Sequence, residues 1–221
     1  LLEEPENTRY QFYLAQSYFD SQQWEKAEEA YAKRAKMGGW MEEVFYSIFR
    51  VGIIKMIQQK PWPDCQDTFL QAWNVWPHRA EPLYQLAKIH RLNGNPRLAH
   101  MFAKQALEIP YPAGDILFIA DDMYKWQLLD EFAAVAFYAN DFENGVQASL
   151  ALQKMCNDGV IPESEHARMH DNVEHYRKVL TEKMEHAQEA EKSAKEANDK
   201  RRLKMQSMKR KNKKRKAKAR A

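Results

Sequence analysis

Small and large apolar residues recur along the chain in a pattern that predicts pairs of antiparallel helices. In three segments, a small residue of the first helix precedes a small residue of the second by twelve positions: Ala15 and Ala27, Ala87 and Ala99, Ala133 and Gly145. Small residues at fixed offsets let two helices approach closely, and large residues fill the space between pairs. One such pair cannot bury its apolar face alone, so the pairs are expected to stack.

Turn residues divide this pattern into segments. Glycine and proline clusters fall between the periodic stretches, as at Gly38-Gly39 and Pro61-Trp62-Pro63. They predict a linker at 1–8 and helix pairs at about 9–37, 41–77, 80–109 and 127–157. The apolar and aromatic stretch 110–126 is an insertion, expected to pack on the repeats with a short extended or irregular course. A capping helix is expected from residue 163.

The predicted fold class is all-α: a right-handed helical solenoid of about four pairs with an aromatic insertion. Of the 221 residues, 44% are hydrophobic, enough for a real core. No apolar run approaches the ~20 residues of a membrane span. The opening Leu1-Leu2 has no initiator Met and no signal-peptide pattern, so we expect a fragment of a longer protein.

Charge is divided unevenly along the chain. Residues 174–221 hold 18 basic and 7 acidic side chains, a net of +11, whereas the remainder holds 16 basic and 24 acidic ones, a net of −8. Residues 177–221 are therefore predicted to be a charged, helical to disordered basic tail. Two cysteines do not make a disulfide framework; they fit a cytoplasmic protein, and the tail adds a nuclear alternative.

The helix-pair pattern resembles the tetratricopeptide repeat (TPR), a 34-residue helix–turn–helix unit. Four second-helix positions carry the resemblance, at spacings of 38, 34 and 46 residues: Ala27, Cys65, Ala99 and Gly145. Four strings are similar to a narrower group, the helical repeats that follow a family 2-type (GT-A) glycosyltransferase domain. They are Thr8-Arg9-Tyr10-x-Phe12-Tyr13-Leu14-Ala15-Gln16-Ser17-Tyr18, Lys36-Met37-Gly38-Gly39-Trp40-x-Glu42-Glu43-Val44-Phe45-Tyr46-Ser47, Arg79-Ala80-Glu81-Pro82-Leu83-Tyr84 and Leu107-Glu108-Ile109-Pro110-Tyr111-Pro112. This resemblance covers residues 8–176.

The resemblance implies a nucleotide-sugar-dependent transferase upstream, with a metal-binding Asp-x-Asp motif. This chain has no such motif, and Asp121-Asp122 lacks its spacing, so no catalytic residue can be carried over. His166 and His170 lie at the i, i+4 spacing that can bind zinc, but a third ligand is not evident and a surface helix explains them better. No catalytic residue, metal or cofactor is predicted for this segment.

The candidate binding residues fall on the first helix of each pair, which lines the concave side of such a solenoid. By repeat position the inward residues are Arg9, Phe12, Gln16, Phe19, Tyr84, Lys88, Arg91, Phe137 and Tyr138. Aromatic and arginine side chains commonly anchor interfaces. They therefore predict a protein or peptide partner; the alternative is that they merely solvate the inner face.

The basic cluster of the tail has three interpretations: a solubilising end, a site for polyanions such as nucleic acid or acidic lipid, or a nuclear-targeting signal. It comprises Lys209, Arg210, Lys211, Lys213, Lys214, Arg215 and Lys216. Two functions follow for the whole chain. It is either a non-catalytic accessory domain of a glycosyltransferase or a freestanding TPR adaptor with a polyanion-binding tail.

Overall fold

The computed structural model describes residue 4 and residues 6–218, without the side chains of 203 and 206–218. These residues form helices and connecting loops and contain no strand. Four helix pairs come first: α1 (Thr8–Asp20) with α2 (Trp24–Lys36), α3 (Met41–Ile57) with α4 (Trp62–Val75), α5 (Glu81–Leu92) with α6 (Pro96–Leu107), and α7 (Leu128–Ala136) with α8 (Phe142–Asn157). The last helix, α9, runs Glu163–Lys218.

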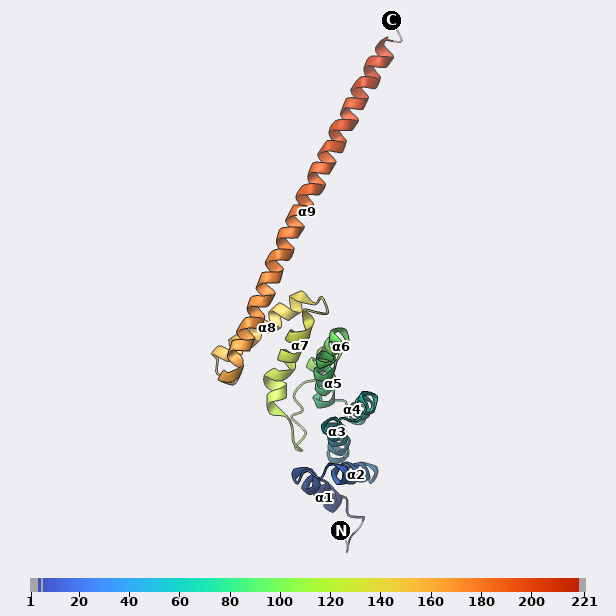
Figure 1. The fold of residues 1–221 in the computed structure, drawn as a ribbon, viewed down its shortest axis with the longest axis vertical. Helices are drawn as coiled ribbons and strands as arrows, with labels where there is room; N and C mark the ends of the chain where they lie inside the picture. Colours follow the sequence, from blue (N-terminus) through green and yellow to red (C-terminus); the bar gives the residue numbers. More distant parts are fainter. Residues whose placement is uncertain (1–3, 5, 219–221) are drawn as a thin grey trace. The chain divides into compact units, whose positions relative to one another are not determined.

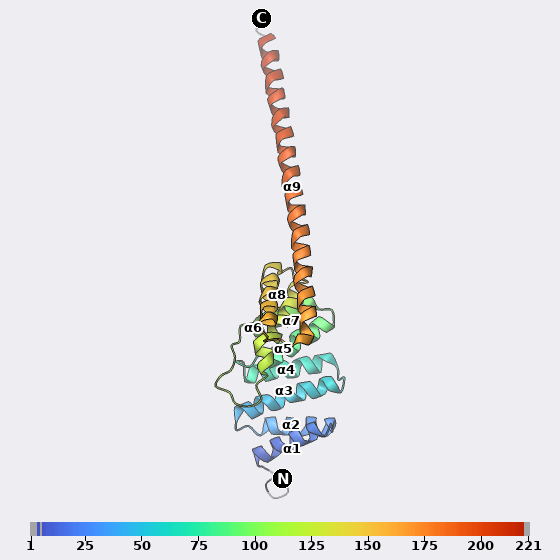
Figure 2. The same ribbon diagram turned by 90° about the vertical axis from the view of Figure 1, so that its left-hand side faces the viewer.

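Each helix of the repeats packs against the next along the chain. Figure 2 shows α1 to α4 as successive layers of one stack, and Figure 1 shows the same order from α1 to α6. Local signals set the helix ends: Asn7 caps α1 by accepting a hydrogen bond from the Tyr10 backbone N–H, and Gly38 and Gly39 turn the chain with φ of 67° and 82°.

The small residues that marked the pattern form the contacts between helices. Ala15, Ala27, Ala87 and Ala99 are all 0% exposed and Ala133 is 2% exposed. Three apolar clusters follow one another, one around Phe12 and Tyr31, one around Phe69 and Leu83, and one around Phe132 and Leu152. Burial of this kind is the dominant favourable term in folding, so these clusters stabilise the stacking of successive pairs.

The segment between α6 and α7 is irregular rather than helical as far as residue 120. It then enters a π-helix, η1 (Met123–Gln127), which continues directly into α7. The chain therefore enters the fourth pair through a helical turn that is wider than an α-helical one. The apolar side chains of Met123 and Trp126 are already buried in this turn, at 4% and 7% exposure.

The chain forms two units, residues 1–173 and residues 174–221. The first contains the four pairs and the beginning of α9, where Met169 is 1% exposed within the last apolar cluster. The second consists of the remainder of α9, and its described side chains from Thr181 onward are exposed. No helix in the described part of the chain combines the length and apolar character needed to cross a membrane.

Candidate functional site

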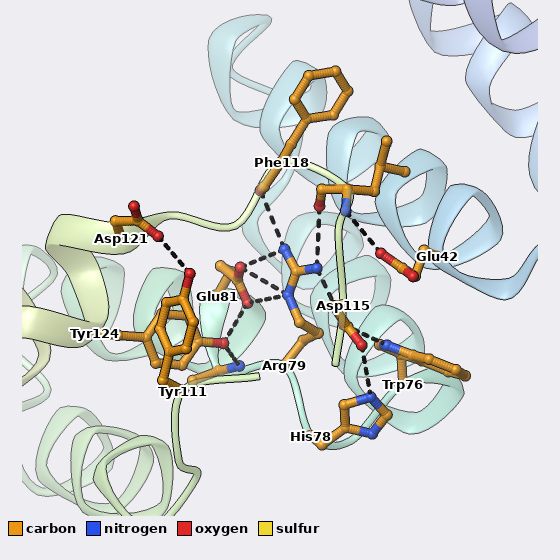
Figure 3. A network of polar contacts seen from close by, with 12 residues as sticks. Glu42, Trp76, His78, Arg79, Glu81, Tyr111, Asp115, Phe118, Asp121 and Tyr124 are labelled. Atoms are coloured by element: carbon orange, nitrogen blue, oxygen red, sulfur yellow. Dashed lines mark hydrogen bonds and ion pairs between the residues drawn. The ribbon is translucent and has the colours of Figure 1, made fainter. Parts of the chain in front are cut away.

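A buried polar cluster holds the insertion against the repeats (Figure 3). At its centre is Arg79, 1% exposed, which donates hydrogen bonds of 2.6–3.0 Å to Glu81. The same guanidinium donates to Asp115 at 3.3 Å and to the carbonyls of Leu117 and Phe118 at 3.2 Å. Burial opposes the charge of Arg79, but the hydrogen bonds and attraction of Glu81 outweigh it and raise the pKa of the guanidinium.

The flanks of this cluster come from the start of α3, the end of α4 and η1. Glu42, at the start of α3, accepts 2.8 Å hydrogen bonds from the backbone N–H groups of Ile116 and Leu117. Trp76 Nε1 donates to Asp115 at 2.9 Å, and the Tyr124 hydroxyl donates to Glu81 at 2.9 Å. We call Glu42, Arg79, Glu81, Asp115 and Tyr124 the latch, because they fasten the insertion to the starts of α3 and α5.

A separate open cavity of about 820 Å³ lies between α5, α7 and the start of α9, and we call it the groove. Tyr84, Lys88 and Arg91 line it from α5 at offsets of four and three, which place them on one helix face. Trp126, Asp130, Ala134 and Tyr138 line it at offsets of four from η1, α7 and the turn that follows. The third wall consists of Glu165, Arg168 and Asn172 from α9.

Arginine–carboxylate pairs cross the groove and fix its walls. Arg91 of α5 donates to Glu131 of α7 through Nε at 2.7 Å and Nη2 at 3.1 Å. Arg168 of α9 makes a bidentate pair with Asp130 of α7 at 2.8 and 2.9 Å, and also pairs with Glu165 at 2.8 Å. Bidentate geometry orients both partners. The three helices are thus held at set positions around the cavity.

The structure brings together four of the predicted groove residues: Tyr84, Lys88, Arg91 and Tyr138 all line the cavity. Others lie elsewhere. Arg9 pairs with Glu43 and stacks over Trp40, and Phe19 packs under Arg50, whose guanidinium carbon is 3.6 Å from its ring centroid. Gln16 is half-buried on α1, and Phe137 is half-buried against Phe142.

Phe12 corrects the repeat-position assignment. Its repeat position predicts the inner face, but it is 1% exposed and meets Tyr31 and Tyr46 edge-on, with ring centroids about 6 Å apart. A large aromatic ring gains more from full burial between α1, α2 and α3 than from exposure in a groove. Phe12 is therefore a packing residue.

Repeat position places Asp130 on the inner face as well, but it does not indicate Trp126, Glu131 and Arg168, which also line the groove. The sequence places Trp126 in the insertion and predicts only a capping helix from residue 163. A four-residue spacing from Trp126 to Asp130, Ala134 and Tyr138 was the signal available, but the π-helical turn hides where the helix begins.

The histidine pair on α9 has structural partners. His166 Nε2 lies 2.9 Å from the Ile161 carbonyl oxygen, and His170 Nδ1 lies 3.1 Å from Gln153 Nε2. No group of three metal-ligating side chains occurs among the described residues. The side chains of the basic cluster Lys209, Arg210, Lys211, Lys213, Lys214, Arg215 and Lys216 lie outside those the structure describes.

Comparisons with known proteins define the fold. The chain is similar to the solved structure of YrrB, described as a TPR protein with an unusual peptide-binding site, with a TM-score of 0.59 and 13% identity over 81% of this chain and 80% of that one. It is also similar to BtubC (BKLC) from P. vanneervenii, with a TM-score of 0.54 and 18% identity over 71% of this chain and 66% of that one. No protein-family model and no curated protein matches the chain.

The chain has a TPR-like fold. The helix pairs, their stacking and the two structural likenesses confirm the predicted all-α solenoid. At this level of sequence identity the likeness concerns the fold alone.

Proposed function

We propose that this chain is a non-catalytic scaffold that binds a peptide, or a segment of another protein, in the groove. One observation carries the proposal: an open cavity of about 820 Å³ bounded by three helices that ion pairs hold in place. Its walls present Tyr84, Trp126 and Tyr138 beside charged groups, a mixture that anchors protein interfaces. The likeness to a TPR protein with a peptide-binding site supports the same class of ligand.

A random peptide library selected against the full chain tests the proposal. Selected peptides should lose binding to a Tyr138→Ala variant, because Tyr138 is 63% exposed and lines the groove. The matched control is Tyr10→Ala, since Tyr10 is 47% exposed on α1 and does not line the groove. Peptides that bind both variants equally well would place the binding surface elsewhere.

We further propose that the scaffold serves as the accessory domain of a glycosyltransferase whose catalytic domain precedes it. The support is that two of the strings that resemble such proteins contain Glu42, Arg79 and Glu81 of the latch, so the resemblance includes residues that shape this particular insertion. A coding sequence upstream with alternating strands, helices and an Asp-x-Asp motif is expected. The chain alone should transfer no sugar from a nucleotide sugar, and activity above background would contradict this assignment.

The competing proposal is a freestanding adaptor whose basic tail is a second anchor. The net charge of +11 over residues 174–221 favours it. Unrelated sequence upstream, together with tail-dependent binding of polyanions, would support the adaptor over the accessory domain.

A further inference from the structure

The acidic side chains of the groove are already paired. Glu131 accepts from Arg91, and both Asp130 and Glu165 accept from Arg168, all at distances of 2.7–3.1 Å. Two arginines thus engage all three carboxylates of the groove in hydrogen-bonded ion pairs. A ligand has little to gain from competing with these bidentate pairs.

One cation of the groove, Lys88, makes no such pair. Lys88 is exposed on α5, between Tyr84 and Arg91, and no hydrogen bond or ion pair joins it to any other described residue. Its ammonium group carries a full positive charge and three donors. It is the unpaired charge of the groove walls, so a ligand that carries a negative charge is favoured there.

Two neutral donors lie in the same walls. The indole Nε1 of Trp126 is buried, and no described atom accepts its hydrogen bond although the side chain borders the groove. A buried N–H without an acceptor costs free energy, which an acceptor from a ligand recovers. Tyr84 supplies a hydroxyl; burial, followed by the charges of Glu131 and Asp130, raises its pKa to about 12, so it stays protonated and can donate.

We propose, as a refinement that rests on the proposed function, that the groove recognises a carboxylate of its peptide ligand through Lys88, with Tyr84 and Trp126 as neutral donors. The carboxylate comes from an Asp or Glu side chain or from a peptide C-terminus. A single carboxylate matches the single unpaired cation. A nucleic acid matches poorly, because its row of phosphates would also meet Asp130, Glu131 and Glu165.

The test uses the full chain and arrays of short synthetic peptides. Each sequence is made in an acidic form and in an amide form, with Asn and Gln replacing Asp and Glu, and each with a free or an amidated C-terminus. The wild-type chain should prefer carboxylate-bearing forms. Lys88→Gln should reduce that preference about tenfold, whereas Lys88→Arg, which keeps the charge, should retain it. Tyr84→Phe, which removes only the hydroxyl, should reduce it roughly threefold.

A control variant distinguishes the loss of Lys88 from the loss of one positive charge elsewhere on the chain. Lys33→Gln removes an exposed lysine of α2 that does not line the groove, and it should leave the preference unchanged. A preference for carboxylates that survives Lys88→Gln in full would overturn the inference. So would displacement of the peptides from the groove by oligothymidylate in a Lys88-dependent manner.

The two levels of the proposal fail differently. Peptides that bind in a Tyr138-dependent way, but equally in acidic and amide forms, would overturn the carboxylate inference and leave the scaffold function standing. Absence of any Tyr138-dependent binding would overturn both. Dependence on the free C-terminus, or on the acidic side chains, would support the inference and identify the source of the carboxylate.

Discussion

Gly52 of α3 lies directly against the ring of Phe69 of α4. A Cβ built at this position would lie 2.7 Å from Cε1 and 2.9 Å from Cδ1 of Phe69, which is itself 0% exposed. Alanine normally favours a helix over glycine by about 1 kcal/mol. Here that gain opposes an overpacking cost of about 1–3 kcal/mol, because the buried ring has no space into which to move.

We therefore expect Gly52→Ala to lower the free energy of unfolding by about 1–2 kcal/mol, measured by urea denaturation. Gly114→Ala is the matched control, since no atom lies within 4 Å of a Cβ there. It should change the free energy by less than about 0.5 kcal/mol. A Gly52→Ala variant more stable than the wild type would mean that α3 and α4 are farther apart than described.

His90 makes the stability of the third pair depend on pH. It is 4% exposed, lies parallel to the ring of Phe102 and meets Trp62 edge-on, and burial lowers its pKa. The folded chain therefore binds this proton less readily than the unfolded chain. The stability is complete above the unfolded pKa of about 6.5 and declines as the pH falls below that value.

His90→Gln should flatten this part of the pH profile. Thermal melting between pH 8 and pH 5 should show a smaller fall in Tm for the variant than for the wild type. His186→Gln is the control, because His186 is exposed on α9. Equal slopes for His90→Gln and the wild type would contradict a buried neutral imidazole.

At the scale of elements, we expect the latch to keep the insertion ordered on the repeats. Arg79→Met keeps an unbranched side chain but leaves Glu81, 4% exposed, without its cation. Removing one partner of a buried ion pair costs about 3–5 kcal/mol. We expect a loss of that size in urea denaturation, together with proteolytic cleavage within residues 113–120. Lys125→Met breaks the exposed 3.6 Å pair with Asp122 and should have an effect near zero.

The helix pairs could be predicted from the sequence because small residues recur where two helices pack closely. The predicted contact residues Ala15, Ala27, Ala87 and Ala99 are all fully buried. The packing of the insertion was expected from its apolar character, but its partners were not. Glu42 accepts from residues 74 and 75 positions later, and no local periodicity encodes such a contact.

The groove was only partly predictable for the same reason. The α5 face follows from repeat position, and its residues Tyr84, Lys88 and Arg91 do line the cavity. Phe12 occupies an equivalent face of α1 yet is buried, because α3 covers it with Tyr46. The α9 wall depends on how the chain turns after α8, which the spacing of apolar residues does not encode.

At the scale of the whole molecule, the basic tail should account for binding of polyanions. Residues 200–220 carry thirteen positive charges and no negative ones. Deleting 200–221 should abolish binding to heparin or DNA, and binding by the full chain should weaken steeply with salt because counterions are released. The melting temperature should not change, since the apolar clusters lie within residues 12–169. Salt-independent binding, or loss of folding on deletion, would contradict a detachable electrostatic arm.

The latch also bears on how the repeats unfold. In a simple repeat array each unit contacts only its neighbours, so the ends can open one unit at a time. Here Glu42, at the start of the second pair, is bonded to a segment that Arg79 and Tyr124 fasten to the third pair and to the start of the fourth. Opening the second or the third pair breaks bonds to the insertion, and opening the start of the fourth breaks the bonds of Tyr124 to the third pair. Amide protons of α3, α5 and α7 should then exchange with solvent in a single cooperative step, while α1 and α2 fray separately.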